Sequence, residues 1–455
     1  MRQPFILTPA AAALKWLAVG STLLCFSLAA RSMDLLQAYQ AAQQNDATIL
    51  AARATAEAER ERLPQARAQL LPNLSANLSR NNNHLESTAP NFLGVEQTTY
   101  NNYPSNNQTL SLRQPLFRKQ LAAQYRQATA QVQDAEATLS GEEQNLAVRV
   151  SGAYFEALLT HEQLALVLAQ QAEYIQQLDA ARKLYAGGAG TRTDVDEAQS
   201  RLDMNRAVEI ESRQNVTYTL QQLETLVNQP IDKLASLDVA RLELLDPQPN
   251  RLQDWIARAE LNNPQLQSLK ARVDVARQET EKARSGHYPT LDAIAQWTNS
   301  DSESVTNIKQ SYTNKLIGMQ LNIPLFAGGY VNSQVRQTLA GLDRAEQLLE
   351  AGRRDLGLRV FKEFRGITEN IPKIKALEQA LLSADQMVLS SRKSFEAGSR
   401  TALDVSNALR QRLVVQRDLA QTRYEYLIAK VRLLALVGGA DIETVTAINR
   451  VLQDI

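Results

Sequence analysis

A sixteen-residue segment near the C-terminal end of the chain has a counterpart 210 residues earlier. The later copy is KSFEAGSRTALDVSNA (Lys393–Ala408), and the earlier copy is KLYAGGAGTRTDVDEA (Lys183–Ala198). The two align without a gap and share six identical positions, which is more than composition explains. A duplication of this kind indicates that one structural unit occurs twice. The identical pairs are Lys183/Lys393, Gly188/Gly398, Thr191/Thr401, Asp194/Asp404, Val195/Val405 and Ala198/Ala408.

Both copies have the pattern of a helical hairpin tip. In each copy a long helical pattern ends at glycine, and Thr-x-x-Asp then opens a second helical pattern. The predicted turn residues are Gly187, Gly188 and Gly398. Asp194 and Asp404 follow a threonine N-cap by three residues, where a carboxylate accepts a hydrogen bond from the cap and is favoured by the helix dipole. Capping is therefore one explanation of both acids, and a functional role for the same carboxylates stays open.

The segment 1–32 is a predicted secretory signal peptide. A basic start with Arg2 and Lys15 precedes the apolar run Trp16–Ala30 and a group of small residues. The run is shorter than the roughly 20 apolar residues that a spanning helix needs. We therefore expect the chain to be exported. Cys25 is the only cysteine and lies inside this run, so we expect no disulfide and no Cys-based metal site in the mature chain.

The charge balance argues against one broad class of function. Removal of the segment 1–32 would leave 46 basic residues against 49 acidic ones. Such a balance gives no electrostatic basis for binding nucleic acid, so we expect no nucleic-acid partner. Only 5% of the residues are aromatic, whereas 44% are hydrophobic. This composition suits long packed helices better than a single globular core.

Two pairs of β-strands are predicted, one in each half of the chain. Apolar and polar residues alternate over about 71–80 and again over 108–114. The polar, Asn-rich segment 81–107 between them is expected to be a loop. The second half repeats the alternation weakly over 290–299 and clearly over 316–323. The two predicted structural repeats are 33–240, with its hairpin tip near 187–194, and 241–455, with its tip near 397–404.

A very long helix is predicted after each strand pair. No strong break interrupts the helical pattern from Arg118 to about Ala186, or from Val331 to about Ala397. At a rise of 1.5 Å per residue, each helix would be a rod about 100 Å long. Pro372 lies inside the second rod, and proline removes a backbone hydrogen bond there. We therefore expect a kink or break near Pro372.

The number of strands decides the predicted architecture. Strands of about 9 to 11 residues with one apolar and one polar face are typical of an outer-membrane barrel wall. Four strands cannot close a barrel, and open sheet edges are not tolerated in lipid. Several chains would therefore share one barrel, with the helical rods projecting from one end. A solvent-exposed β cap on a helical rod is the alternative interpretation of the same strands.

Together these features resemble the TolC family of outer-membrane exit ducts. The resemblance lies in the duplicated layout, in the segments Pro115–Phe117 and Pro324–Phe326, and above all in Gly398–Thr401 followed by Asp404 and Val405. It covers essentially the whole mature chain. It implies a mainly α fold with a small β part, in which long antiparallel coiled-coil hairpins join four membrane strands per chain. A homotrimer would then form one 12-stranded barrel and a periplasmic α-helical tunnel.

The resemblance also implies a location and partners. The location is the outer membrane of a Gram-negative bacterium, with a long periplasmic part. The implied partners are two further copies of the chain, outer-membrane lipid, a periplasmic adaptor (membrane fusion) protein and an inner-membrane ABC or other pump. The exported substrate would be a polypeptide or a small molecule. The tunnel would close where the repeated hairpins meet.

The same resemblance assigns roles at the hairpin tips. Asp404 matches the carboxylate that lines the pore constriction. Arg400 matches the arginine that ties the inner hairpin to the outer one, with Thr193 and Asp194 as its partners. Three Asp404 side chains around a narrow three-fold pore would repel one another and concentrate cations there. A link from Arg400 to Asp194 would be a modest, salt-sensitive latch on the closed state.

Two positions depart from the family pattern. Many relatives have a second ring carboxylate where this chain has Asn407, so we expect a ring of three carboxylates at the constriction instead of six. Many relatives have tyrosine where this chain has Phe395, which has no hydroxyl to bond with Asp194. We therefore expect fewer links to hold the closed state than in those relatives.

We expect no enzyme activity, no cofactor and no metal site. His84, His161 and His287 are isolated, and no zinc-protease or P-loop spacing occurs. Type I secretion of a polypeptide is the first functional expectation, because a lipid-anchor cysteine and a long C-terminal extension are both missing. Multidrug or other small-molecule efflux through the same duct is the alternative. A periplasmic structural rod without a channel is the third hypothesis.

Overall fold

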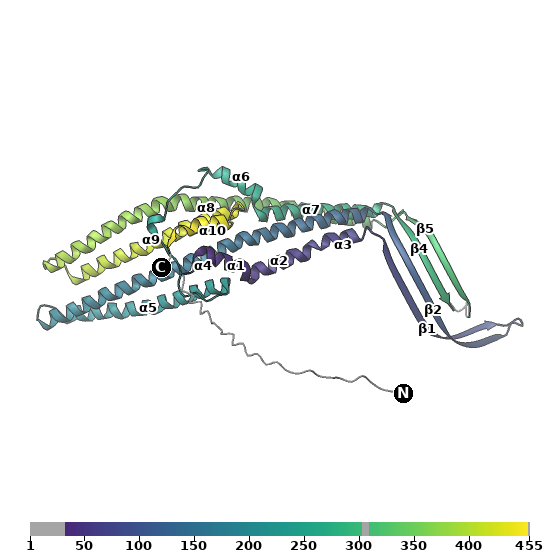
Figure 1. The fold of residues 1–455 in the computed structure, drawn as a ribbon, viewed down its shortest axis with the longest axis horizontal. Coiled ribbons are helices and arrows are strands. Elements are labelled where there is room, and N and C mark those ends of the chain that lie inside the picture. The colour runs from purple at the N-terminus through teal and green to yellow at the C-terminus, as the bar shows by residue number, and fades with distance from the viewer. Residues whose placement is uncertain (1–31, 303–308, 454–455) are drawn as a thin grey trace, which may run out of the picture.

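The computed structural model describes residues 32–302 and 309–453, so all of the predicted signal peptide except Ser32 lies outside the described residues. The described chain is mainly helical, with a four-stranded antiparallel sheet at one end of a long helical body (Figure 1). The two hairpin tips lie at the opposite end (Figure 1). No helix in these two stretches combines the length and the apolar character needed to cross a membrane.

The same series of elements occurs in both halves of the chain. Helices precede a pair of antiparallel strands, a very long helix leads to a hairpin tip, and a shorter helix returns. The first half contains α1 (Leu35–Asn45), α2 (Ala47–Arg60), α3 (Arg62–Ala68), β1 (Asn73–Pro90), β2 (Glu96–Phe117), α4 (Lys119–Ala186) and α5 (Arg192–Val227). The second half contains α6 (Leu252–Asn262), α7 (Pro264–Arg284), β4 (Thr290–Asp301), β5 (Ser311–Asn322), α8 (Tyr330–Glu396) and α9 (Ala402–Leu436). The short elements β3 (Ser236–Leu237), α10 (Ile442–Asn449) and β6 (Leu452–Gln453) lie between or after these two series.

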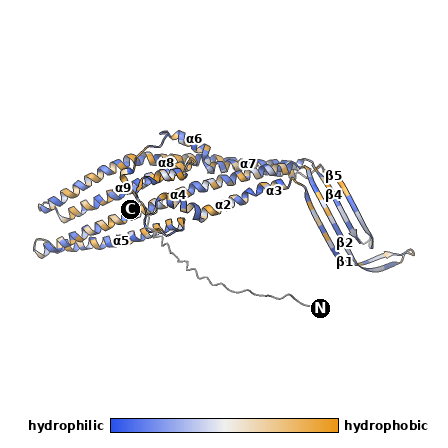
Figure 2. Cartoon of the chain, in the orientation of Figure 1, coloured by the Kyte–Doolittle hydropathy of each residue, from blue (hydrophilic) through white to orange (hydrophobic). Residues whose placement is uncertain are grey.

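The four long strands form one sheet in the order β1-β2-β4-β5. Residues opposite each other in an antiparallel ladder place their side chains on the same face. The register therefore gathers apolar residues of all four strands on one face, and hydrophobic and hydrophilic positions alternate along the strands (Figure 2). Polar residues such as Asn77, Ser111 and Gln320 lie on the opposite face. The apolar face contains Leu74, Ala76, Leu78, Leu110, Leu112, Ala293, Ala295, Trp297, Ile317, Met319 and Leu321.

β1 and β2 are much longer than the sequence predicts. They continue through most of the segment 81–107 and turn only at 91–95, so the loop prediction is wrong for most of that segment. The side chains of the segment 81–107 are mostly polar and show no alternation of apolar and polar residues, but strands can pair through their backbones without such alternation. Polar groups pair across the two strands instead; the hydroxyls of Thr88 and Thr98 lie 2.8 Å apart. The first strand pair therefore extends well beyond β4, which ends at Asp301.

A buried carboxylate joins the sheet to the helical body. Asp292 lies near the start of β4, and its side chain is only 3% exposed. Arg113 on β2 donates from Nε to Asp292 Oδ2 at 2.9 Å, and Arg118, just before α4, donates from Nε to Asp292 Oδ1 at 2.8 Å. Two cations from the first half of the chain thus neutralise one anion from the second half. Without the two arginines, the buried carboxylate would lack a partner, which is strongly destabilising.

α8 is continuous from Tyr330 to Glu396 and contains Pro372 in its interior. The break expected at this proline is therefore wrong, and a kink there stays a prediction. The helix is held on both sides of the proline, because Ile371 packs against the main core and Ile374 is fully buried in it. This packing offsets the roughly 3 kcal/mol that a proline costs in a helix interior.

The main hydrophobic core lies at mid-length, where α1, α4, α8, α9 and α10 supply most of its residues (Figure 1). Tyr154 on α4 is fully buried, and its hydroxyl lies 3.0 Å from the carbonyl oxygen of Met33 and 2.9 Å from that of Ala235. One side chain thus fixes α4 to the segments before α1 and after α5. The other large, fully buried side chains include Tyr426, Leu35, Ile49, Leu146, Leu223, Leu356, Ile374 and Leu433.

We predict that Arg113→Ala and Arg118→Ala together destabilise the protein more than Asp292→Asn. The double change leaves a buried carboxylate unpaired, which costs about 3–5 kcal/mol. The single change leaves two arginines whose side chains are 52% and 29% exposed and still reach water. The thermal unfolding midpoint of the purified proteins measures the difference, and Arg60→Ala, in an exposed pair, is the control. Equal losses would show that burial of this charge does not hold the sheet to the helices.

Candidate functional site

Both hairpin tips turn on a glycine with positive φ. Gly188, between α4 and α5, has φ +75°, and Gly398, between α8 and α9, has φ +72°. Residues with a Cβ rarely adopt this left-handed region, so these two positions favour glycine. Gly187, the third predicted turn residue, has an ordinary φ of −82° and caps the end of α4.

The two aspartates of the repeated motif form identical capping boxes. Asp404 Oδ2 accepts from the backbone N–H of Thr401 at 2.9 Å and from its hydroxyl at 2.8 Å. Asp194 Oδ2 accepts from the same groups of Thr191 at 2.9 and 2.7 Å. Each threonine hydroxyl in turn accepts from the aspartate N–H, which closes the box. The capping explanation thus accounts for the local geometry of both acids within one chain.

These hydrogen bonds keep both carboxylates ionised. The backbone N–H and the hydroxyl of Thr401, with a smaller contribution from Arg400, hold the pKa of Asp404 below its ordinary value of 3.8. The hydroxyl and the backbone N–H of Thr191 lower the pKa of Asp194 in the same way. Because these pKa values are lower in the folded state, the stabilising effect of the caps is present at neutral pH. It is lost as the pH falls through the lowered pKa.

Arg400 is held within its own hairpin. Its Nη1 donates to Ser391 Oγ at 3.0 Å, and Ser391 is fully buried. Among the described residues, no hydrogen bond or ion pair joins Arg400 to Thr193 or Asp194. The structure therefore does not bring the predicted latch residues together within one chain, and the latch stays a prediction.

The two tips face each other across a cleft of about 200 Å³. Asp194 lines the cleft from the first hairpin, and Thr401 and Leu403 line it from the second. Asn407 lies further along α9 than Asp404 and is exposed in the single chain, as is Thr193. The predicted constriction and latch residues thus belong to one end of the molecule.

One ion pair that sequence reasoning misses joins the two hairpins above their tips. Arg392 Nη2 on α8 lies 2.6 Å from Glu173 Oε2 on α4, and their side chains are 46% and 33% exposed. The sequence could have drawn attention to Arg392, because an arginine directly precedes both copies of the repeated motif, at Arg182 and Arg392. No signal identifies its partner, which is 219 residues away in the sequence.

Each hairpin end has a small hydrophobic cluster of its own, separate from the main core. Regions with few buried apolar contacts open at lower free energy than a large core. The tips are therefore the part of the helical body best suited to move. The cluster at the second tip contains Val388, Val405, Ala408 and Leu409 with the half-buried Phe395, and that at the first tip contains Tyr174, Leu178 and Leu202.

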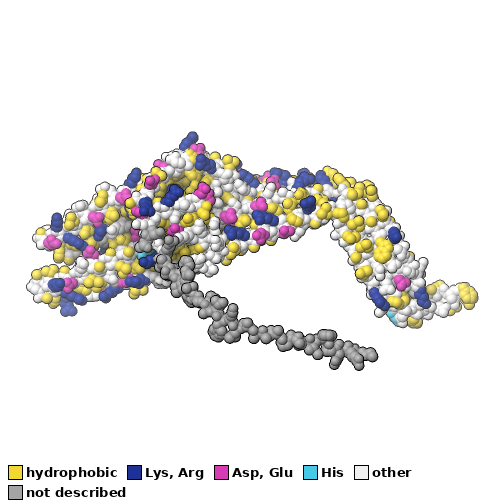
Figure 3. Space-filling view, in the orientation of Figure 1, with side chains coloured by type: hydrophobic (Ala, Val, Ile, Leu, Met, Phe, Trp, Pro, Cys, Tyr) yellow, Lys and Arg dark blue, Asp and Glu magenta, His cyan; other side chains and the backbone are white. Residues whose placement is uncertain are grey.

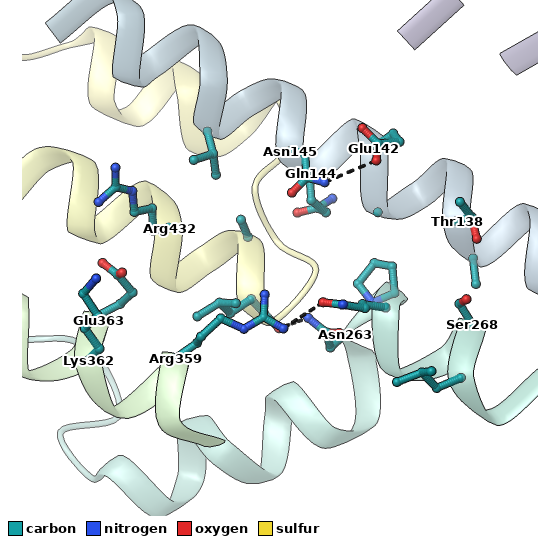
Figure 4. Close-up of a pocket in the computed structure, with 18 of the residues that line it drawn as sticks. Thr138, Glu142, Gln144, Asn145, Asn263, Ser268, Arg359, Lys362, Glu363 and Arg432 are labelled. Carbon is teal, nitrogen blue, oxygen red and sulfur yellow. Dashed lines mark hydrogen bonds between the residues drawn. The ribbon is translucent and has the colours of Figure 1, made fainter. Parts of the chain in front are cut away.

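A separate cavity of about 640 Å³ lies at mid-length, where α9 ends and α7 begins (Figure 4). Asn263 Nδ2 donates to the carbonyl oxygen of Leu436 at 3.0 Å and joins the two helix ends. Acidic and basic side chains, including Glu363 and Arg432, both line the cavity, so its charges favour no single ligand. In the described part of the chain, no group of three or more His, Cys, Asp or Glu is placed to hold a metal ion. We interpret the cavity as a helix junction.

A model of the outer membrane efflux protein family matches residues 38–229 and 255–439, which include all four long strands and both hairpin tips. Alkaline protease secretion protein AprF of Pseudomonas aeruginosa is 34% identical over 439 residues, which cover 95% of this chain and 90% of AprF. Proteases secretion protein PrtF of Dickeya chrysanthemi is 31% identical over 411 residues, covering 90% of this chain and 89% of PrtF.

Two further similarities concern the predicted family and the fold. Outer membrane protein TolC of Escherichia coli is 27% identical over 455 residues, covering 96% of this chain and 88% of TolC. The solved structure of the outer-membrane channel OprN superposes with a TM-score of 0.76 at 18% identity, covering 96% of this chain and 98% of OprN. The resemblance to the TolC family is thereby confirmed, and the chain belongs to the outer membrane efflux protein family of the bacterial outer membrane.

Proposed function

We propose that this protein is the outer-membrane exit duct of a type I protein secretion system. The observation that carries the proposal is the similarity to two protease secretion proteins, which exceeds 30% identity over at least 90% of the chain. In this role the protein receives an unfolded polypeptide from an inner-membrane ABC pump and a periplasmic adaptor. It passes the polypeptide across the periplasm and the outer membrane, and it catalyses no reaction.

The sheet supports a trimeric duct. β1 and β5 are the two edge strands, and the described chain offers neither of them a partner on its outer side. The apolar face of the sheet suits contact with lipid, and the opposite, polar face suits an aqueous lumen. Three copies would pair β1 of one chain with β5 of the next and close 12 strands. The helices that continue from the strands would then surround a common axis as a tunnel.

The hairpin tips would form the periplasmic gate of this duct. Around the three-fold axis, Asp404 would contribute one ionised carboxylate per chain, and Asn407 would add no further charge. The ion pair between Arg392 and Glu173 would hold the second hairpin against the first within each chain. Because no hydrogen bond or ion pair joins Arg400 to Asp194 within the described chain, we infer that this link, if Arg400 makes it as the family pattern implies, is made between neighbouring chains.

Small-molecule efflux is the second candidate function. The family whose model matches the chain is named for efflux. Outer membrane efflux protein BepC of Brucella suis is 25% identical over 72% of the chain. An efflux duct would have the same sheet, helices and gate. The substrate, not the architecture, separates the two functions.

Deletion of the gene in its native host distinguishes type I secretion from small-molecule efflux. We expect one or more secreted proteins to disappear from the medium and to return when the wild-type gene is restored, while susceptibility to drugs and detergents changes little. Mass spectrometry of the medium and growth inhibition assays measure the two effects. An unchanged set of secreted proteins together with increased drug susceptibility would contradict type I secretion and favour efflux.

The change Asp404→Asn should reduce the cation preference of the channel. Asparagine keeps an oxygen acceptor for the Thr401 N–H but removes three negative charges from the proposed ring, so the ratio of potassium to chloride permeability should fall toward one. Reversal potentials in planar bilayers under a salt gradient measure this ratio. Asp196→Asn, an exposed acid beside the first tip, is the matched control. If selectivity is the same in both variants, the constriction lies elsewhere.

Breaking the ion pair between the hairpins should open the resting channel. An exposed ion pair contributes up to about 1 kcal/mol, so Arg392→Glu should raise the open fraction up to about fivefold for each chain that loses the pair. The reversed pair, Arg392→Glu with Glu173→Arg, should restore the wild-type resting conductance. Arg354→Glu, which breaks a pair within α8, is the control. If the reversed pair conducts like the single variant, these two residues do not hold the gate.

A further inference from the structure

The β1–β2 hairpin continues beyond the sheet as a two-stranded ribbon. β4 ends at Asp301 opposite Asn106, whereas β1 and β2 continue to pair from Asn81/Ser105 to Pro90/Glu96. Ten residue pairs at about 3.3 Å each give a ribbon about 33 Å long. The ribbon lies at the end of the molecule opposite the hairpin tips (Figure 1). In the proposed duct it would project from the outer mouth of the barrel.

Side-chain hydrogen bonds give this ribbon a defined form. The hydroxyl of Tyr100 donates to Glu86 Oε1 at 3.0 Å across the two strands. At the turn, Asn91 Oδ1 accepts from the backbone N–H groups of Leu93 and Val95 at 2.9 and 3.1 Å. A two-stranded hairpin is only marginally stable in water on its own. These bonds, and the continuity with the sheet, support it.

The supported turn presents apolar side chains to solvent. Phe92, Leu93 and Val95 are 95%, 71% and 60% exposed. All three belong to the turn between β1 and β2, and Figure 3 shows hydrophobic side chains at that end of the ribbon. Water disfavours such exposure, and a clustered apolar surface at the end of a polar element is typical of an interaction site.

Both edges of the ribbon are also open. In the part of the chain that the structure describes, β1 has only β2 as a ladder partner, and β2 from Glu96 to Ser105 has only β1. Each edge therefore presents backbone N–H and C=O groups to which an extended polypeptide can add a strand. A third strand would also relieve the marginal stability of two strands alone.

The charge of the ribbon selects among occupants. Its acidic residues are Glu86 and Glu96, and the sequence has no Lys or Arg between Arg80 and Arg113. Anionic lipid head groups would be repelled, and a second copy would bring the same two acids to the contact. An unfolded polypeptide offers apolar side chains, lysines and arginines, and free backbone groups, which complement the tip, the acids and the edges.

We propose that the ribbon 81–105 is a docking site for the exported polypeptide as it leaves the duct. An extended segment of that polypeptide adds to an edge of the ribbon and contacts Phe92, Leu93 and Val95. This inference rests on the proposed secretion function. It makes the outer mouth a second contact site for the substrate, separate from the periplasmic gate.

Site-specific cross-linking tests the proposal in cells that export their natural substrate. A photoreactive phenylalanine analogue in place of Phe92 should cross-link to the exported polypeptide. In a chain with the analogue at Tyr100 instead, the triple change Phe92→Ser, Leu93→Ser and Val95→Ser should lower the substrate yield about tenfold, because three apolar side chains leave the contact. The pair Gln310→Ser and Asn314→Ser, at exposed polar positions outside the ribbon, should leave that yield unchanged.

Cross-links only to a second copy of this chain, only to lipid, or to nothing at all would overturn the docking site. So would an unchanged yield in the triple variant. Conductance of each variant in planar bilayers confirms that the duct itself is intact. Loss of the docking site leaves the proposed function standing if gene deletion still abolishes protein export. If deletion leaves export unchanged, the proposed function fails on its own.

Discussion

The four-stranded sheet has two open edges, β1 and β5, and these edges limit how the chain can lie in a membrane. Backbone groups without hydrogen-bond partners cost several kcal/mol each in lipid, and the outer sides of β1 and β5 have no partner strand in the described chain. In the proposed trimer, edge-to-edge pairing of copies would give these two edges their hydrogen-bond partners. Because α4 follows β2 and α8 follows β5, closing the sheet in that trimer would also bring the long helices around one axis. The buried Asp292, shared by Arg113 and Arg118, sits where these two parts join.

Stability is distributed unevenly along the helical body, and this suits a gated duct. Most of the buried apolar residues lie at mid-length, around Tyr154 and Tyr426, where segments from both ends of the chain meet. The hairpin ends have small hydrophobic clusters, and the exposed pair of Arg392 with Glu173 joins one hairpin to the other. In the proposed duct, the large core would fix the middle of the helical body, whereas the hairpin ends, with their smaller clusters, would be the part that opens.

Patterns that are local in the sequence predicted the fold well. The repeated glycine and Thr-x-x-Asp motif gave both hairpin tips, and its capping boxes form as the spacing requires. Period-two alternation predicted most of β4 and β5 and the part of β1 and β2 that lies in the four-stranded sheet. It did not predict the ribbon 81–105, because polar side chains give no such signal. The break predicted at Pro372 is wrong, because packing of the neighbouring residues against the core offsets the local free-energy cost of a proline in a helix. The sequence does not predict that Glu173 is the partner of Arg392, because this contact depends on how α4 and α8, which are far apart in the sequence, lie against each other.

The number of chains in the detergent-purified protein shows whether the open sheet edges pair between copies. Native mass spectrometry on the mature protein, extracted from outer membranes without cross-linking, measures this number. We predict three chains per particle, because three sheets of four strands would close one barrel and leave no open edge. A stable particle of a single chain extracted from the membrane would contradict it, since one open sheet would then persist in lipid.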